Sequence, residues 1–141
     1  MNHVKAKLML AIYIKGKSLE PAEITALLGV EPSKVQRFGE QKLTSSMKRV
    51  SALTGLWAYS IESETHTVAE LVEKLAEQFR NCTGMLSTLP NVEEKYLDLF
   101  IAYDAETDGG GEYVFELASN DMSLLGQFGL PVRFTVASVP P

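Results

Sequence analysis

The residues best suited to chemistry lie in a basic, hydroxyl-rich stretch between positions 34 and 57. It contains five cations, two adjacent serines and the only tryptophan of the chain: Lys34, Arg37, Lys42, Lys48, Arg49, Ser45, Ser46 and Trp57. Lys and Arg donate charge-assisted hydrogen bonds to carboxylates and phosphates. The stretch therefore favours a site for a small anion, a phosphate group or an acidic peptide. The candidate ligand-binding residues are Arg37, Gly39, Glu40, Lys42 and Trp57. The alternative is a solvated basic loop with Trp57 filling the core beneath it.

Groups that could act as nucleophiles or bases are few. The histidines are His3, at the N-terminus, and His66, just before a predicted helix. The sequence has no Gly-x-Ser-x-Gly turn that would expose a nucleophilic serine. Cys82 follows a predicted helix, and a lone cysteine is more often a small buried residue than a reactive thiolate. We therefore expect no catalytic residue.

The spacing of the metal-ligating residue types does not fit a metal site. His66 has no His or Cys at a ligand spacing such as i+4. Asp104, Glu106, Asp108 and Glu112 surround a run of three glycines, but their spacing matches no calcium loop. The glycines also lack the Lys-Ser/Thr pair of a phosphate-binding loop. We therefore expect no metal and no cofactor, and a solvated hairpin tip around the glycines.

Composition is typical of one soluble domain. The chain has 141 residues, of which 45% are hydrophobic, enough for a substantial core. No apolar run approaches the ~18 residues of a membrane span, and the N-terminal residues do not have the form of a signal peptide. One cysteine cannot form an internal disulfide. These features predict a cytoplasmic protein with no membrane partner.

The charge of the chain is uneven. Its net value of −5 argues against non-specific binding to nucleic acid. Residues 1–60 carry nine Lys and Arg against four Glu, whereas residues 61–141 carry four Lys and Arg against fourteen Asp and Glu. The asymmetry is consistent with a molecule that has one basic and one acidic face. Alternatively, the two halves of the sequence interleave in space and the charge difference averages out over the surface.

Hydrophobic periodicity predicts eight elements in the order β-α-β-α-β-β-α-β. Strands are expected at 4–14, 56–62, 95–104, 112–118 and 131–138, and helices at 21–28, 68–80 and 120–128. Helix 68–80 is the clearest, because Thr67 and Glu70 match the reciprocal cap at a helix start. Glycines 109–111 predict a hairpin between the third and fourth strands. Residues 31–55 form a long basic loop that is functional, mobile or holds a short element.

The order of elements predicts the fold. Without the first strand and helix it is β-α-β-β-α-β, the split arrangement of ferredoxin-like domains. We therefore predict one α+β domain over residues 1–141, with a ferredoxin-like core at 56–138 and an added βα unit at 1–30. The five-stranded sheet should be mostly antiparallel, with helices on one face. Residues 8–32 and 113–131 share one pattern (strand, serine, short helix, glycine, aliphatic residue, proline), which fits equivalent βα units in this sheet.

The sheet face away from the helices is expected to be apolar. Strand alternation assigns to it Met9, Ala11, Tyr13, Ala58, Phe100, Ala102, Val114, Ala118, Thr135 and Ala137. A contiguous exposed patch of this kind usually marks a partner surface. Met9, Tyr13, Phe100 and Val114 are therefore candidate interface residues, either for a homodimer or for another protein partner. A one-residue slip in a strand would invert the assignment for that strand.

A motif near the N-terminus resembles a known family. Residues 19–32 read Leu-Glu-Pro-Ala-Glu-Ile-Thr-Ala-Leu-Leu-Gly-Val-Glu-Pro, followed by Gly39-Glu40 and Gly55-Leu56-Trp57. Together they resemble an uncharacterised bacterial family called domain of unknown function 4279. The likeness covers most of the chain and implies a small bacterial single-domain protein. It implies no activity, because the family has no established catalytic residues to carry over.

Three hypotheses of function follow. The leading one is a non-enzymatic protein-interaction module, comparable in size and acidity to the immunity proteins that neutralise toxins. The second is a ligand-binding or regulatory domain that uses residues 34–57 to bind a small anion. The third is an enzyme of an unrecognised type, which the sparse catalytic residues favour least.

Overall fold

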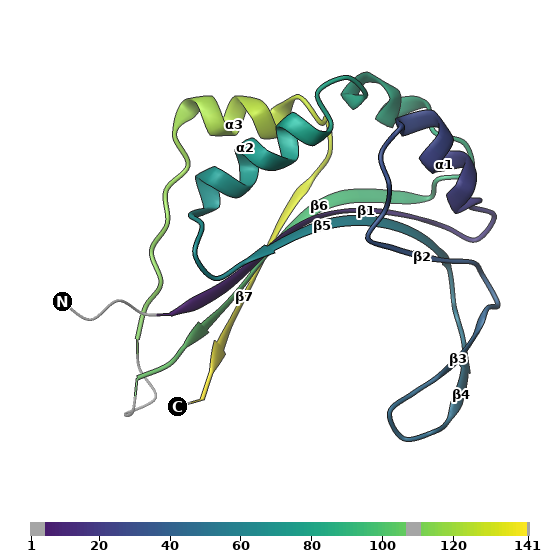
Figure 1. Cartoon of the computed structure of the whole chain (residues 1–141), viewed down its shortest axis with the longest axis horizontal. Coiled ribbons are helices and arrows are strands. Elements are labelled where there is room, and N and C mark those ends of the chain that lie inside the picture. Colours follow the sequence, from purple (N-terminus) through teal and green to yellow (C-terminus); the bar gives the residue numbers. More distant parts are fainter. Residues whose placement is uncertain (1–4, 107–110, 141) are drawn as a thin grey trace.

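The computed structural model describes residues 5–106 and 111–140 as one curved sheet covered by helices on one side (Figure 1). The elements in chain order are β1 (Ala6–Gly16), α1 (Pro21–Leu28), β2 (Lys34–Gln36), β3 (Gln41–Leu43), β4 (Arg49–Ser51), β5 (Gly55–Ser63), α2 (Val68–Gln78), a 3-10 helix (Thr83–Thr88), β6 (Glu94–Asp104), α3 (Ser119–Gly126) and β7 (Val132–Val139). The sheet has five strands in the order β2-β5-β1-β6-β7. β3 and β4 pair separately.

The predicted α+β class and the mostly antiparallel five-stranded sheet are confirmed, but the strand order differs from the ferredoxin-like prediction. β1 pairs antiparallel with both β5 and β6 and so lies at the centre of the sheet. β6 and β7 pair in parallel. The segment that the prediction treated as an N-terminal addition thus supplies the central strand. Its side chains Leu8, Leu10, Ile12 and Ile14 are at most 1% exposed, as expected where neighbours flank a strand on both sides.

The strand predicted at 112–118 is absent from the sheet. Residues 111–118 form an extended strap instead, in which Tyr113, Phe115 and Leu117 pack against the core while Val114 is 75% exposed. Buried and exposed side chains do alternate along this segment. Alternation requires only that one side of the segment packs on the core, and it does not require pairing with another strand. Residues 113–131 are therefore not a second βα unit of the sheet. Residues 108–110 of the predicted hairpin lie outside the described residues.

The long basic connection contains short strands. β2 pairs with β5 at one edge of the sheet, and β3 pairs with β4 to form a hairpin. Gly39 begins this hairpin with a φ of 81°, a left-handed conformation that glycine adopts readily. The Gly39 N–H donates to the Ala52 carbonyl at 2.9 Å, and the Ala52 N–H donates to the Glu40 carbonyl at 2.9 Å. The Gly39-Glu40 pair therefore closes the base of the hairpin through its backbone.

The packing of helix α2 follows from its sequence. The Glu70 N–H donates to Thr67 Oγ1 at 3.2 Å and the Thr67 N–H donates to Glu70 Oε1 at 2.9 Å, so the predicted cap forms. Leu71 and Leu75 are fully buried on the side that faces the sheet. Within the described residues, no helix is long and apolar enough to cross a membrane.

Two glycines pair where β1 and β5 meet the loop that precedes β6. Gly16 lies opposite Gly55 in the ladder. A Cβ on Gly16 would collide with the Asn91 carbonyl oxygen, and a Cβ on Gly55 would lie 2.6 Å from the Gly16 carbonyl oxygen. The glycine of the Gly55-Leu56-Trp57 motif is therefore explained by close backbone packing.

Candidate functional site

Trp57 lies in the core, on the sheet face that the helices cover. Its side chain is 0% exposed and meets the Phe79 ring edge-on at 6.3 Å. Its Nε1–H donates to Thr25 Oγ1 at 3.0 Å, and the Thr25 hydroxyl donates to the Pro21 carbonyl at 3.2 Å. The two sequence motifs are thus joined, since Thr25 belongs to the helical motif and Trp57 to the strand motif. A ligand does not reach the indole in this arrangement.

The other candidate ligand-binding residues lie on the outside of the molecule, around the β3–β4 hairpin. Arg37 forms an ion pair with Glu20 at 3.0 Å, and Lys42 Nζ donates to Gln36 Oε1. Gly39-Glu40 contributes the backbone bonds at the hairpin base. The structure therefore brings Arg37, Lys42 and Gly39-Glu40 to one region and separates them from the Trp57 ring.

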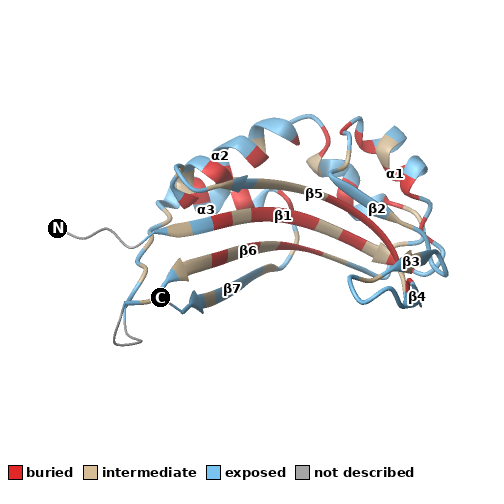
Figure 2. Ribbon diagram, turned by 60° about the horizontal axis from the view of Figure 1, so that its bottom comes forward, coloured by how far each residue is buried: buried red, intermediate tan, exposed pale blue. Residues whose placement is uncertain are grey.

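A second surface lies on the other side of the sheet. We call it the open face, because no helix of the described residues covers it (Figures 1 and 2). It consists of the residues of β1, β5, β6 and β7 that alternate with the core-facing ones. The ladder registers assign to it Lys7, Met9, Ala11, Tyr13, Lys15, Leu56, Ala58, Ser60, Glu62, Glu94, Tyr96, Asp98, Phe100, Ala102, Arg133, Thr135 and Ala137.

Three of the four candidate interface residues gather on the open face. Met9 lies opposite Phe100, and Tyr13 lies two positions along β1 beyond Ala11. Val114 belongs to the strap and lies elsewhere. The sequence analysis assigned ten residues to the sheet face away from the helices. Eight of them lie on the open face, and Val114 and Ala118 do not.

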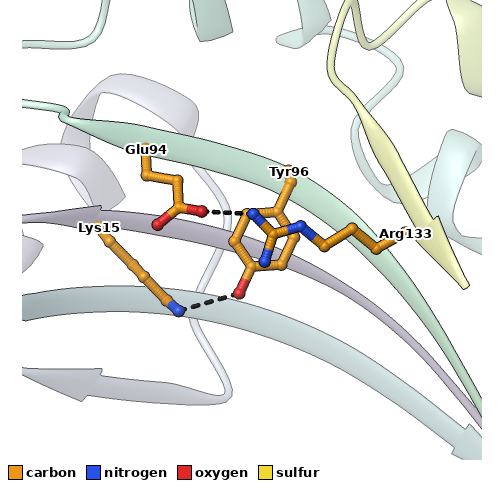
Figure 3. Close-up of polar contacts among 4 residues, drawn as sticks. All are labelled: Lys15, Glu94, Tyr96 and Arg133. Carbon is orange, nitrogen blue, oxygen red and sulfur yellow. Dashed lines mark hydrogen bonds and ion pairs between the residues drawn. The ribbon is translucent and has the colours of Figure 1, made fainter. Parts of the chain in front are cut away.

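Tyr96 is the centre of a polar and aromatic cluster on the open face (Figure 3). Its ring lies 5.4 Å from that of Tyr13, and its hydroxyl accepts a hydrogen bond from Lys15 Nζ at 2.9 Å. The Arg133 guanidinium carbon lies 3.7 Å from the Tyr96 ring centroid, and Arg133 is also ion-paired with Glu94. Tyr96 is only 7% exposed although no helix covers it, because these charged side chains pack around the ring.

Sequence reasoning missed most of this cluster. Tyr96, Lys15, Glu94 and Arg133 come from three strands and were not among the candidates. Alternation places Tyr96 on the same face as Phe100, which was an available signal. Nothing local indicates that Arg133 reaches Tyr96, because that contact depends on the parallel register of β7 against β6.

The Tyr13 phenol on the open face has a raised pKa. Burial raises the pKa of the Tyr13 phenol, the nearby Asp98 carboxylate and Tyr96 raise it further, and Lys15 opposes them. Thr135 Oγ1 donates to Asp98 Oδ1 at 3.1 Å. The phenol therefore keeps its proton, and the charged groups around it are engaged with one another.

Ser63 and His66 form a contact that the sequence did not suggest. Ser63 Oγ lies 2.7 Å from His66 Nδ1, and His66 lines a pocket between the start of α2 and the strap. However, Ser63 Oγ also accepts the backbone N–H groups of Thr65 at 3.1 Å and His66 at 3.0 Å. The serine therefore holds a turn before the helix, as serine side chains commonly do.

Cys82 is buried, and burial raises the pKa of its thiol, which keeps it protonated and unreactive. Among residues 5–106 and 111–140, no group of three or more His, Cys, Asp or Glu side chains could hold a metal ion.

Fold and surface together define a small α+β protein built on a curved sheet with one helix-covered face and one open face. Over residues 5–138 the sequence matches the family described as domain of unknown function (DUF4279), and the chain belongs to that family. No curated protein and no solved structure matches the chain. The family match spans the whole described sheet apart from the last residue of β7.

Proposed function

We propose that this chain is a protein-interaction module that binds a partner protein through the open face. The observation that carries the proposal is the cluster of Tyr13, Tyr96, Lys15 and Arg133, in which two aromatic rings and two cations pack together on a face that no described helix covers (Figure 1). Tyr and Arg are enriched among the residues that contribute most to protein–protein binding. Their rings and guanidinium are already ordered by mutual packing, which lowers the entropic cost of binding.

The surroundings of the cluster support the same function. Ala11 and Ala58 form a floor of small side chains that are at most 4% exposed, so a partner would contact the larger side chains around them. Met9 and Phe100 are partly exposed beside this floor and offer apolar contact area. An apolar centre with a charged border is the usual composition of an interface.

The charges at the border indicate a protein rather than a polyanion. Three cations and three carboxylates share the face: Lys7, Lys15, Arg133, Glu62, Glu94 and Asp98. Nucleic acid and anionic membranes select surfaces with an excess of positive charge, whereas mixed charges favour a specific complementary protein surface.

The test compares arginine substitutions at two apolar positions, one partly exposed and one exposed. Phe100→Arg places a charge on the open face, whereas Val114→Arg places it on the strap. The partner is captured with the immobilised wild-type chain, purified, and titrated against each variant by calorimetry. We expect Phe100→Arg to weaken binding by roughly thirtyfold, the effect of losing about 2 kcal/mol at an important interface position. Val114→Arg should leave the affinity unchanged.

Circular dichroism of both variants must match that of the wild type for the comparison to count. An affinity that is the same in Phe100→Arg as in the wild type would refute the assignment of the open face. If the partner is a second copy of the chain, light scattering should show self-association that Phe100→Arg abolishes and Val114→Arg retains.

A further inference from the structure

Strand β7 leaves one of its two edges unpaired within the described residues. It is the last strand in the sheet order, and Figure 2 shows it at the border with mostly exposed residues. The Leu97 N–H donates to the Pro131 carbonyl and the Ala105 N–H donates to the Val139 carbonyl, so the odd-numbered residues direct their backbone groups toward β6. Successive residues of a strand direct these groups to opposite sides. The N–H and C=O groups of Val132, Phe134, Val136 and Ser138 therefore point outward.

Among the described residues, this edge lacks most of the devices that usually protect an edge strand, although the Phe115 ring of the strap stacks on that of Phe134. β7 is eight residues long, whereas β2, at the other edge, has only three. Its sequence, Val-Arg-Phe-Thr-Val-Ala-Ser-Val, has no proline and a single charge. Phe134 and Val136 are 52% and 55% exposed. Natural edge strands are normally short, charged, bulged or covered, because an open edge is a template for another strand.

We propose that β7 pairs antiparallel with β7 of a second copy of this chain, which joins the two sheets into one continuous sheet. The open edge itself argues for an extended strand as the occupant, since it offers alternating donors and acceptors along its length. A second copy fits because the edge is complementary to itself under a twofold axis at Thr135.

The register follows from the outward groups and the side chains. With the axis at Thr135, Phe134 of each copy lies opposite Val136 of the other, and the two residues exchange both backbone hydrogen bonds. An aromatic side chain opposite a β-branched one is a favourable cross-strand pair, as is Thr135 opposite Thr135. Arg133 faces Ala137 of the second copy, so that no like charges oppose each other. The two open faces then adjoin on the same side of the joined sheet.

The decisive variant is Val136→Pro. Proline removes an outward N–H that the isolated chain does not use, and proline is tolerated on the solvent side of edge strands. We expect wild-type mass, measured by sedimentation over a concentration series, to rise from 15.5 kDa to twice that value. Val136→Pro should weaken the dimer by roughly tenfold to a hundredfold, since one hydrogen bond is lost from each copy. The matched variant Thr135→Pro removes an N–H that faces β6 and should instead lower the melting temperature.

A second variant protects the test against misfolding of the proline variant. Val136→Lys keeps the backbone N–H and places a charge on the edge, so it should also give a folded monomer. Val114→Lys, on the exposed strap, should leave the dimer intact. In the wild type, amide exchange at Phe134 and Val136 should slow as concentration rises. A wild type that stays at the mass of one chain, or a dimer that survives both Val136 variants, would overturn the proposal. Phe100→Arg, which disturbs the open face and not the edge of β7, should keep this dimer. The failure of this proposal and the failure of the open-face proposal can therefore be told apart.

Discussion

The hydrogen bond between Trp57 and Thr25 should make a measurable contribution to stability. The indole N–H is fully buried and Thr25 Oγ1 is its acceptor at 3.0 Å. Thr25→Val keeps the shape of the side chain but leaves this N–H without a partner. Trp57→Phe removes the donor and leaves unfilled space beside Phe79. Comparing the two changes, alone and combined, isolates the contact between α1 and β5.

The magnitudes follow from burial. Leaving a buried donor unpaired costs about 1–3 kcal/mol, so Thr25→Val should lower the free energy of unfolding by that amount. Trp57→Phe should cost about 2–3 kcal/mol, less than the loss on truncation to alanine because one ring remains. In the double variant no donor is left unpaired. We therefore expect it to cost less than the sum of the single variants by about 1 kcal/mol.

Urea unfolding followed by far-ultraviolet circular dichroism measures all three changes on one scale. Thr88→Val is the matched control, because Thr88 also donates to a backbone carbonyl in its own turn, that of Met85 at 3.1 Å, but is exposed. It should change stability by no more than about 0.5 kcal/mol. Additive costs in the double variant, or a Thr25→Val that costs no more than the control, would refute the reasoning.

Two further predictions concern backbone packing and high pH. Gly16→Ala should lower the melting temperature, because the added Cβ would collide with the Asn91 carbonyl oxygen. Gly84→Ala is the control and should not lower it, because the space around Gly84 is open. Equal melting temperatures for the two variants would contradict this prediction. The raised pKa of Tyr13 means that the folded chain holds the phenol proton to higher pH than the unfolded chain. Its contribution is therefore complete below the unfolded pKa of about 10 and is lost as pH rises through the folded pKa. In urea unfolding above about pH 9, the free energy of unfolding should fall less steeply with pH for Tyr13→Phe than for the wild type. The same dependence on pH in both proteins would argue against this prediction.

Several features of the fold could be predicted because they depend on nearby residues. The cap of α2 formed as expected, since Thr67 and Glu70 are three positions apart and satisfy each other's backbone groups. Alternation along β1 separated Leu8 and Leu10 on the core face from Met9 on the open face. The motif around Pro21 was explained by helix packing, and the structure adds the Trp57 contact to it.

The candidate site was only partly accessible to the same reasoning. Met9, Tyr13 and Phe100 could be assigned to one face by alternation alone. The strap residue Val114 was grouped with them because its segment alternates in the same way, although it has no strand partner among the described residues. A basic stretch next to a tryptophan suggested a ligand site, whereas the alternative placed Trp57 in the core, which is where its ring lies.

By itself, the sequence determined the three α-helices, the four long strands and the side chains that share a face within each, because these properties repeat every two or three to four residues along one segment. Only the tertiary structure decided that β1 is the central strand, that residues 111–118 form a strap and that β7 runs parallel to β6. All segments of the chain compete to pair and to become buried. Because the entropic cost of closing a loop rises only slowly with its length, segments far apart in the sequence can pair as readily as neighbouring ones. The register of β7 thereby placed Arg133 over Tyr96 and left an open edge at Phe134 and Val136.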